Sequence, residues 1–148
     1  MTRDMLERRL FWLLFALWAL SFLLPADSDL TTFGYGLALL SYVSLVLCIG
    51  EGPEGPDALF LCYNGLLGLA NLPMLVTPFG LSRAQKGKGR LLAALLAVFA
   101  IPGTLLPFTP VGREIWGRGI AFPVWVASVF GMAILFLWVA FSRRGAKR

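Results

Sequence analysis

Few side chains in this sequence could take part in chemistry. The chain contains no histidine and only two cysteines, so it offers no set of convergent metal ligands. No serine or cysteine stands beside a base in the pattern of an activated nucleophile, and no phosphate-binding glycine loop occurs. No ionisable side chain falls inside the long apolar runs, where proton-coupled transporters usually carry one. The sequence therefore predicts no catalytic residue, no metal site and no cofactor.

Two asparagines are the polar residues that interrupt an apolar run most clearly. Asn64 and Asn71 lie seven residues apart, and therefore on nearly the same face of a helix. One interpretation is that they form hydrogen bonds between membrane helices, which contribute about 0.6 to 2 kcal/mol each. The other is that they line a polar path for a solute. We favour the structural role.

Small residues also recur at helical spacing and allow close approach of neighbouring helices. These residues are Gly65 and Gly68, Ala93 and Ala97, and Ala127 and Gly131. The sequence predicts that they pack against helices of the same chain or of another one.

The two cysteines flank a stretch rich in glycine and proline. Cys48 precedes this stretch and Cys62 follows it, so a disulfide between them would tie two apolar segments together in an oxidising compartment. Both residues also lie inside apolar runs, where unpaired thiols are common core residues. A disulfide and two buried thiols both fit the sequence.

The composition indicates a membrane protein. Of the 148 residues, 58% are hydrophobic and 14% are charged, whereas a soluble domain has about 25% charged residues. Several apolar runs approach the length of about 20 residues that crosses a bilayer. The net charge is +5, but the basic residues sit in short clusters beside the apolar runs. They are therefore interpreted as topology determinants and not as a nucleic-acid-binding surface.

The basic loop Arg83–Arg90 fixes the predicted topology, because such clusters stay on the cytoplasmic side. Keeping this loop and both termini inside predicts an all-α, four-transmembrane-helix bundle in a single domain. Its crossings are residues 10–24, 58–81, 91–107 and 119–141. The shorter apolar segment 33–49 then forms an extra interfacial or re-entrant helix on the outer side. Trp125 and Trp138 suit the two membrane boundaries of the last crossing.

Several short motifs carry a resemblance. Gly34-Tyr35-Gly36-Leu37-Ala38-Leu39-Leu40, Leu69-Ala70-Asn71-Leu72-Pro73 and Trp125-Val126-Ala127-Ser128 are similar to segments of a family of small, uncharacterised bacterial inner-membrane proteins with four helices. The second motif departs from the Leu-Ala-Asn-Pro run of that family by the insertion of Leu72. The resemblance implies a fold and a location in the bacterial inner membrane, and no activity.

The predicted function is therefore non-catalytic. The expected partners are the lipid bilayer and other membrane chains or a second copy, for which this chain is an accessory or structural subunit. The alternative is a small transporter or channel for a neutral or lipid-like solute, with Asn64 and Asn71 along its path. An enzyme ranks third.

Overall fold

The structure is a computed structural model that describes residues 2–26, 34–51, 62, 65–66, 68–86, 89–105 and 119–142. Within these residues every regular element is a helix, so the all-α prediction is confirmed for the described part of the chain. The helices are α1 (Arg3–Ser21), α2 (Gly34–Glu51), α4 (Asn71–Gln85), α5 (Arg90–Leu105) and α7 (Ala121–Ser142).

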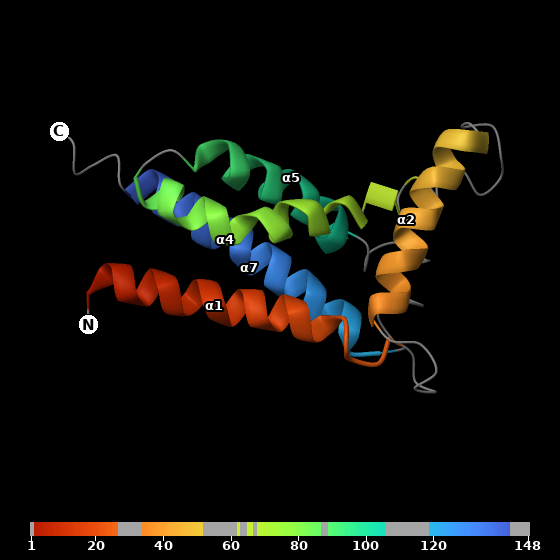
Figure 1. Ribbon diagram of the computed structural model, residues 1–148, viewed down its shortest axis with the longest axis horizontal. Helices are drawn as coiled ribbons and strands as arrows, with labels where there is room; N and C mark the ends of the chain where they lie inside the picture. Colours follow the sequence, from red (N-terminus) through yellow and green to blue (C-terminus); the bar gives the residue numbers. More distant parts are fainter. Residues whose placement is uncertain are drawn as a thin grey trace.

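Four of these helices form a bundle in which successive members run in opposite directions (Figure 1). The start of α1, the end of α7 and the connection from α4 to α5 all lie at one end, which we call the terminal end. Helix α2 lies at the opposite end and is steeply inclined to the bundle. The terminal end thus gathers the parts of the chain on which the sequence places the basic clusters.

Helix α7 is the centre of the bundle, because it packs against α1, α5 and α4. The buried positions of α1 follow spacings of three, four or seven residues, as in Phe11, Trp18 and Ser21. The same spacing gives Ala93, Leu96 and Ala100 on α5. A repeat near 3.5 residues keeps one seam of a helix against its neighbour over several turns. The core of the bundle is therefore built from long seams facing α7.

The start of α4 fits the position of Pro73, and the helix continues past Pro78. The sequence predicts one long crossing over 58–81, but the described helical residues before α4 are followed by a turn at Ala70, and α4 starts at Asn71. Pro73 then lies in the first turn, where a missing backbone donor costs no hydrogen bond. Pro78 lies inside the helix, which continues to Gln85, four residues beyond the predicted end.

Helix α1 begins well before the predicted crossing 10–24. Its first turns contain Asp4, which suits the positive end of the helix dipole, and an Arg3–Glu7 ion pair of 3.0 Å at the i,i+4 spacing that supports a helix. The chain turns away after Ser21, before Pro25. An ionisable residue, Glu7, therefore belongs to the packed part of a helix, although it lies outside the apolar run.

The remaining predicted segments match helices with shifts of one or two residues at each end. Segment 33–49 corresponds to α2, segment 91–107 to α5 and segment 119–141 to α7. Among the described helices, α7 alone is long and apolar enough to cross a bilayer, a property that core helices of soluble proteins can share. The structure thus establishes a helical bundle. The length and hydropathy of its described helices support one membrane crossing and not the predicted four.

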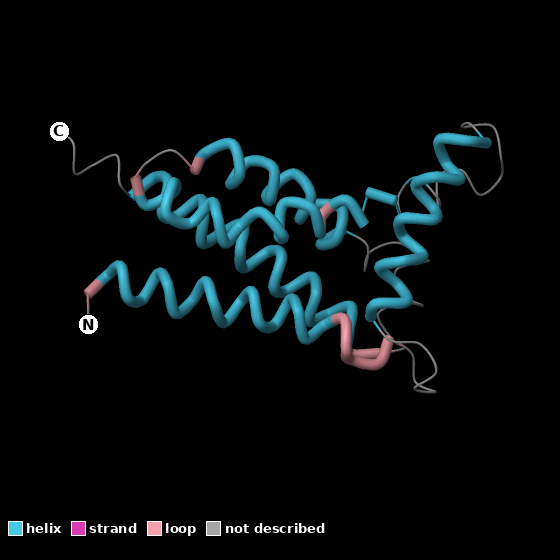
Figure 2. Tube along the Cα trace, viewed as in Figure 1, coloured by secondary structure: helices cyan, strands magenta, loops and turns pink. Residues whose placement is uncertain are grey.

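A tight corner joins the ends of three helices. Figure 2 shows the turn after α1 beside the start of α2. The backbone N–H of Gly34 donates to the carbonyl of Leu24 at 2.9 Å, and that of Ala121 donates to the carbonyl of Pro25 at 3.1 Å. A Cβ atom on Gly34 would clash with the carbonyl of Ser21 at the end of α1, and one on Gly119 would clash with the backbone of Ala26 in the turn that follows. Glycine is needed here because the backbones touch.

Candidate functional site

A polar cluster formed by one asparagine and two tryptophans lies at the end of the bundle nearest α2, where α1 ends and α4 and α7 begin. The Nε1–H of Trp18 on α1 and the Nε1–H of Trp125 on α7 both donate to the side-chain oxygen of Asn71 on α4, at 3.0 and 2.7 Å. The three residues are only 6%, 9% and 5% exposed. An amide oxygen has two lone pairs, so both are used. This Asn71 cluster links three helices through a single atom.

The two tryptophans are held in the same local way. Ser21 follows Trp18 by three residues and donates to its carbonyl at 2.6 Å. Ser128 follows Trp125 by three residues and donates to its carbonyl at 2.7 Å. Because each hydroxyl is satisfied within its own helix, neither competes for the Asn71 oxygen. A Trp-x-x-Ser motif on each of two antiparallel helices therefore presents an indole N–H to the third helix.

Aromatic rings surround this cluster on both sides. Phe22 meets the Trp18 ring edge-on at 5.1 Å, and Phe15 lies 5.3 Å from it between ring centroids. Phe122 stacks on the Trp125 ring at 5.8 Å. Because these rings exclude water, the hydrogen bonds to Asn71 lie in a medium of low dielectric constant, where leaving any of them unmade is costly.

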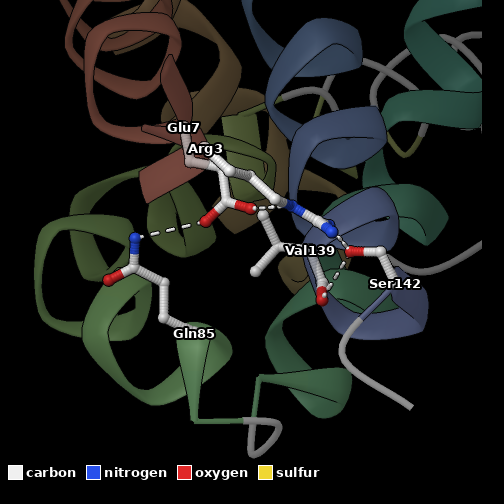
Figure 3. Close-up of polar contacts among 5 residues, drawn as sticks. All are labelled: Arg3, Glu7, Gln85, Val139 and Ser142. Carbon is white, nitrogen blue, oxygen red and sulfur yellow. Dashed lines mark hydrogen bonds and ion pairs between the residues drawn. The ribbon is translucent and has the colours of Figure 1, made fainter. Parts of the chain in front are cut away.

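A second polar cluster ties the helices at the terminal end (Figure 3). The fully buried carboxylate of Glu7 accepts from Arg3 Nε at 3.0 Å and from Gln85 Nε2 on α4 at 3.3 Å. The Arg3 guanidinium also donates to the Ser142 hydroxyl at the end of α7, and it lies 5.1 Å from the ring centroid of Trp138. This Glu7 cluster again joins α1, α4 and α7.

Three of the glycines singled out in the sequence, Gly65, Gly68 and Gly131, are used for packing inside the chain. A Cβ atom on Gly65 would lie 2.9 Å from Leu45, and one on Gly68 would lie 2.9 Å from Ser41. Both glycines therefore face α2, at positions four residues apart on that helix. A Cβ on Gly131 would lie 2.7 Å from a methyl group of Leu14 on α1.

Of the other predicted site residues, some lie outside the described part of the chain and some lie within it. Asn64 and the side chain of Cys48 lie outside the described residues, so the joint role of the two asparagines and the disulfide to Cys62 stay predictions. Ala127 is exposed on α7 and does not pack with Gly131 inside the bundle. Trp125 is buried in the Asn71 cluster near the start of α7, and its place at a membrane boundary stays a prediction.

Sequence reasoning missed the partners of Asn71 and the whole Glu7 cluster. The repeated Trp-x-x-Ser spacing was a usable signal for the first, because a buried indole N–H needs an acceptor. Glu7 gave a weaker signal, since a carboxylate four residues after an arginine usually marks an exposed helix face.

The described geometry of the two clusters holds helices together. Among the described residues no group of three or more histidine, cysteine, aspartate or glutamate side chains could hold a metal ion. Both clusters consist of side chains that bond to one another across helices. No protein-family model, curated protein or solved structure matches this chain.

Proposed function

We propose that this chain is an integral membrane protein whose four-helix bundle crosses the bilayer of the bacterial inner membrane, with α2 on the outer side. The distribution of side chains carries the proposal. Large apolar residues are exposed on every described helix, among them Ile49, Phe79 and Leu91 at 76%, 78% and 74%. A water-soluble monomer rarely exposes contiguous apolar surface on this scale, whereas lipid accepts it.

The interior shows the complementary pattern. The polar side chains of Glu7, Asn71, Thr77 and Ser128 are buried, and Thr77 donates to the Met74 carbonyl of its own helix at 2.6 Å. In a bilayer every polar group has to find its partner within the protein. An apolar exterior around internally bonded polar groups is what this requirement produces.

The alternating helix directions support the proposed orientation. All six described cations lie at the terminal end: Arg3, Arg8, Arg9, Arg83, Lys86 and Arg90. The exposed Trp138 comes from the same part of the bundle, beside Arg3, and tryptophans favour the membrane–water interface. Helices α4 and α5 have 15 and 16 residues, which corresponds to about 22 to 24 Å. The bilayer would thin locally around them.

Labelling of single cysteines tests this topology. Starting from a cysteine-free chain, Lys88→Cys is expected to react with a membrane-impermeant maleimide only from the cytoplasmic side. Glu54→Cys is expected to react only from the outer side. Reaction of Lys88→Cys from outside alone would contradict the four-crossing arrangement.

We further propose that the chain acts as a non-catalytic accessory or structural subunit. The Asn71 oxygen is fully occupied by two indoles, which leaves it no acceptor capacity for a solute and favours the structural role over the transporter or channel. Gly65, Gly68 and Gly131 pack inside the chain and are not available to a partner. A partner chain would therefore contact large, exposed apolar side chains. On α2 these form one face with Leu39, Val43 and Val46.

The mass of the native assembly tests the accessory role. When the protein is extracted gently from its own membrane, native mass spectrometry is expected to show a defined stoichiometric complex with another chain. A monomer or homo-oligomer as the sole species would refute the accessory role. It would favour the alternative function, a small transporter or channel.

A further inference from the structure

Four exposed cations at the terminal end make no ion pair with any described residue. They are Arg8 on α1, Arg83 and Lys86 at the end of α4, and Arg90 at the start of α5. Arg3 differs from them, because its guanidinium is engaged by Glu7 and Ser142. The chain thus separates one cation that holds helices together from four that point their charge outward.

The acidic side chains nearby do not neutralise this end. The described residues there contain two carboxylates, Asp4 and Glu7, against the six cations, and Glu7 is fully buried. Glu7 accepts a hydrogen bond from Gln85, so the start of α1 meets the end of α4. Gly89, just before α5, lies against Ala84 on α4. The four cations without an ion pair to a described residue, Arg8, Arg83, Lys86 and Arg90, are distributed over three helices at this end. We call this set the basic rim.

The basic rim borders directly on apolar surface. Leu91 follows Arg90 and is 74% exposed, and the exposed Trp12 and Leu13 follow within one turn of Arg8 and Arg9 on α1. A nucleic acid or an acidic peptide would leave this apolar surface in water. A lipid of a bilayer matches both parts, with its chains against the apolar side chains and its phosphate at the level of the cations.

We propose that the basic rim binds the headgroups of anionic phospholipids in the leaflet at the terminal end. This inference rests on the proposed membrane insertion and adds the class of lipid that the protein selects. Guanidinium groups donate in pairs to phosphate oxygens, and each cation close to an anionic surface adds about fivefold to the affinity. Because the rim cations have no described protein partner, binding a headgroup breaks no bond within the bundle.

Quenching of tryptophan fluorescence by brominated lipids tests the proposal. The full chain is reconstituted into vesicles containing either brominated phosphatidylglycerol or brominated phosphatidylcholine in an unlabelled background. The wild type is expected to bind phosphatidylglycerol preferentially. Arg8→Gln with Arg83→Gln is expected to lower this preference by at least about fivefold. Lys86→Gln with Arg90→Gln provides a second, independent pair with the same expected loss.

The matched control removes two positive charges from the predicted outer loop. Arg113→Gln with Arg118→Gln is expected to keep the preference of the wild type. Equal quenching by both lipids in the wild type overturns the inference while leaving membrane insertion intact. An equal loss in the control pair overturns it as well, because the effect would then follow net charge. Absence of quenching by either lipid overturns the membrane proposal and this inference together.

Discussion

Replacement of Asn71 by leucine is expected to destabilise the bundle by about 2 to 5 kcal/mol, because two buried indole donors then lose their acceptor and each unsatisfied donor costs about 1 to 3 kcal/mol. The leucine recovers part of this loss by burying apolar surface. Unfolding of the detergent-solubilised protein by dodecyl sulfate, followed by tryptophan fluorescence, measures the change in the free energy of unfolding. Fluorescence suits the purpose because the affected side chains include Trp18 and Trp125.

A mutant cycle separates the hydrogen bonds from the packing. Trp18→Phe or Trp125→Phe removes one donor but leaves the Asn71 oxygen with the other, so each is expected to cost less than Asn71→Leu. In the Asn71→Leu background, the same tryptophan substitutions are expected to cost less still, because each removes an unsatisfied donor. Strictly additive effects would show that the hydrogen bonds contribute nothing. An unchanged stability of Asn71→Leu with loss of transport of a solute would favour the transporter.

Replacement of Gly34 by alanine is the second large effect that we expect. A Cβ atom at this position would lie 2.0 Å from the carbonyl oxygen of Ser21 and 3.0 Å from the Cα of Phe22. Both are backbone atoms, which cannot swing away as a flexible side chain would. The corner between α1 and α2 has to open, and we expect a loss of about 2 to 4 kcal/mol in the free energy of unfolding, at the upper end of single-substitution effects.

The same helix provides the control for this prediction. A Cβ atom on Gly50 would meet nothing within 4 Å. Gly50→Ala is therefore expected to be neutral or to stabilise α2 by up to about 1 kcal/mol, through the lower conformational entropy of alanine in the unfolded chain. Both variants are compared in the same dodecyl sulfate titration. Equal stability of Gly34→Ala and Gly50→Ala would show that the corner is not closed as described.

The two polar clusters place the strongest constraints on how the helices pair. Each joins α1, α4 and α7, one through Asn71 in the aromatic core and the other through Glu7 at the terminal end. Hydrogen bonds at two levels along the same three helices fix both their register and their rotation.

Much of the fold follows from local patterns in the sequence. Long apolar runs separated by glycine, proline and charges indicate helices, and segments 33–49, 91–107 and 119–141 match α2, α5 and α7 closely. The start of α1 was missed because hydropathy marks where a segment becomes apolar, whereas hydrogen bonding continues through the charged first turns. The start of α4 was missed because hydropathy continues through Pro73.

The sequence by itself determined the helical class, the concentration of basic residues in a few segments and the polar interruption at Asn71, since each depends on residue types close together in the chain. Only the tertiary structure decided which side chains meet. Trp18 and Trp125 lie 53 and 54 positions from Asn71, and Gln85 lies 78 positions from Glu7. Spacing within a helix assigns a residue to a face, but the neighbour of that face depends on how helices distant in the sequence pack. The local pattern around Glu7 therefore indicates an exposed helix face, whereas the packing of the bundle buries this side chain fully.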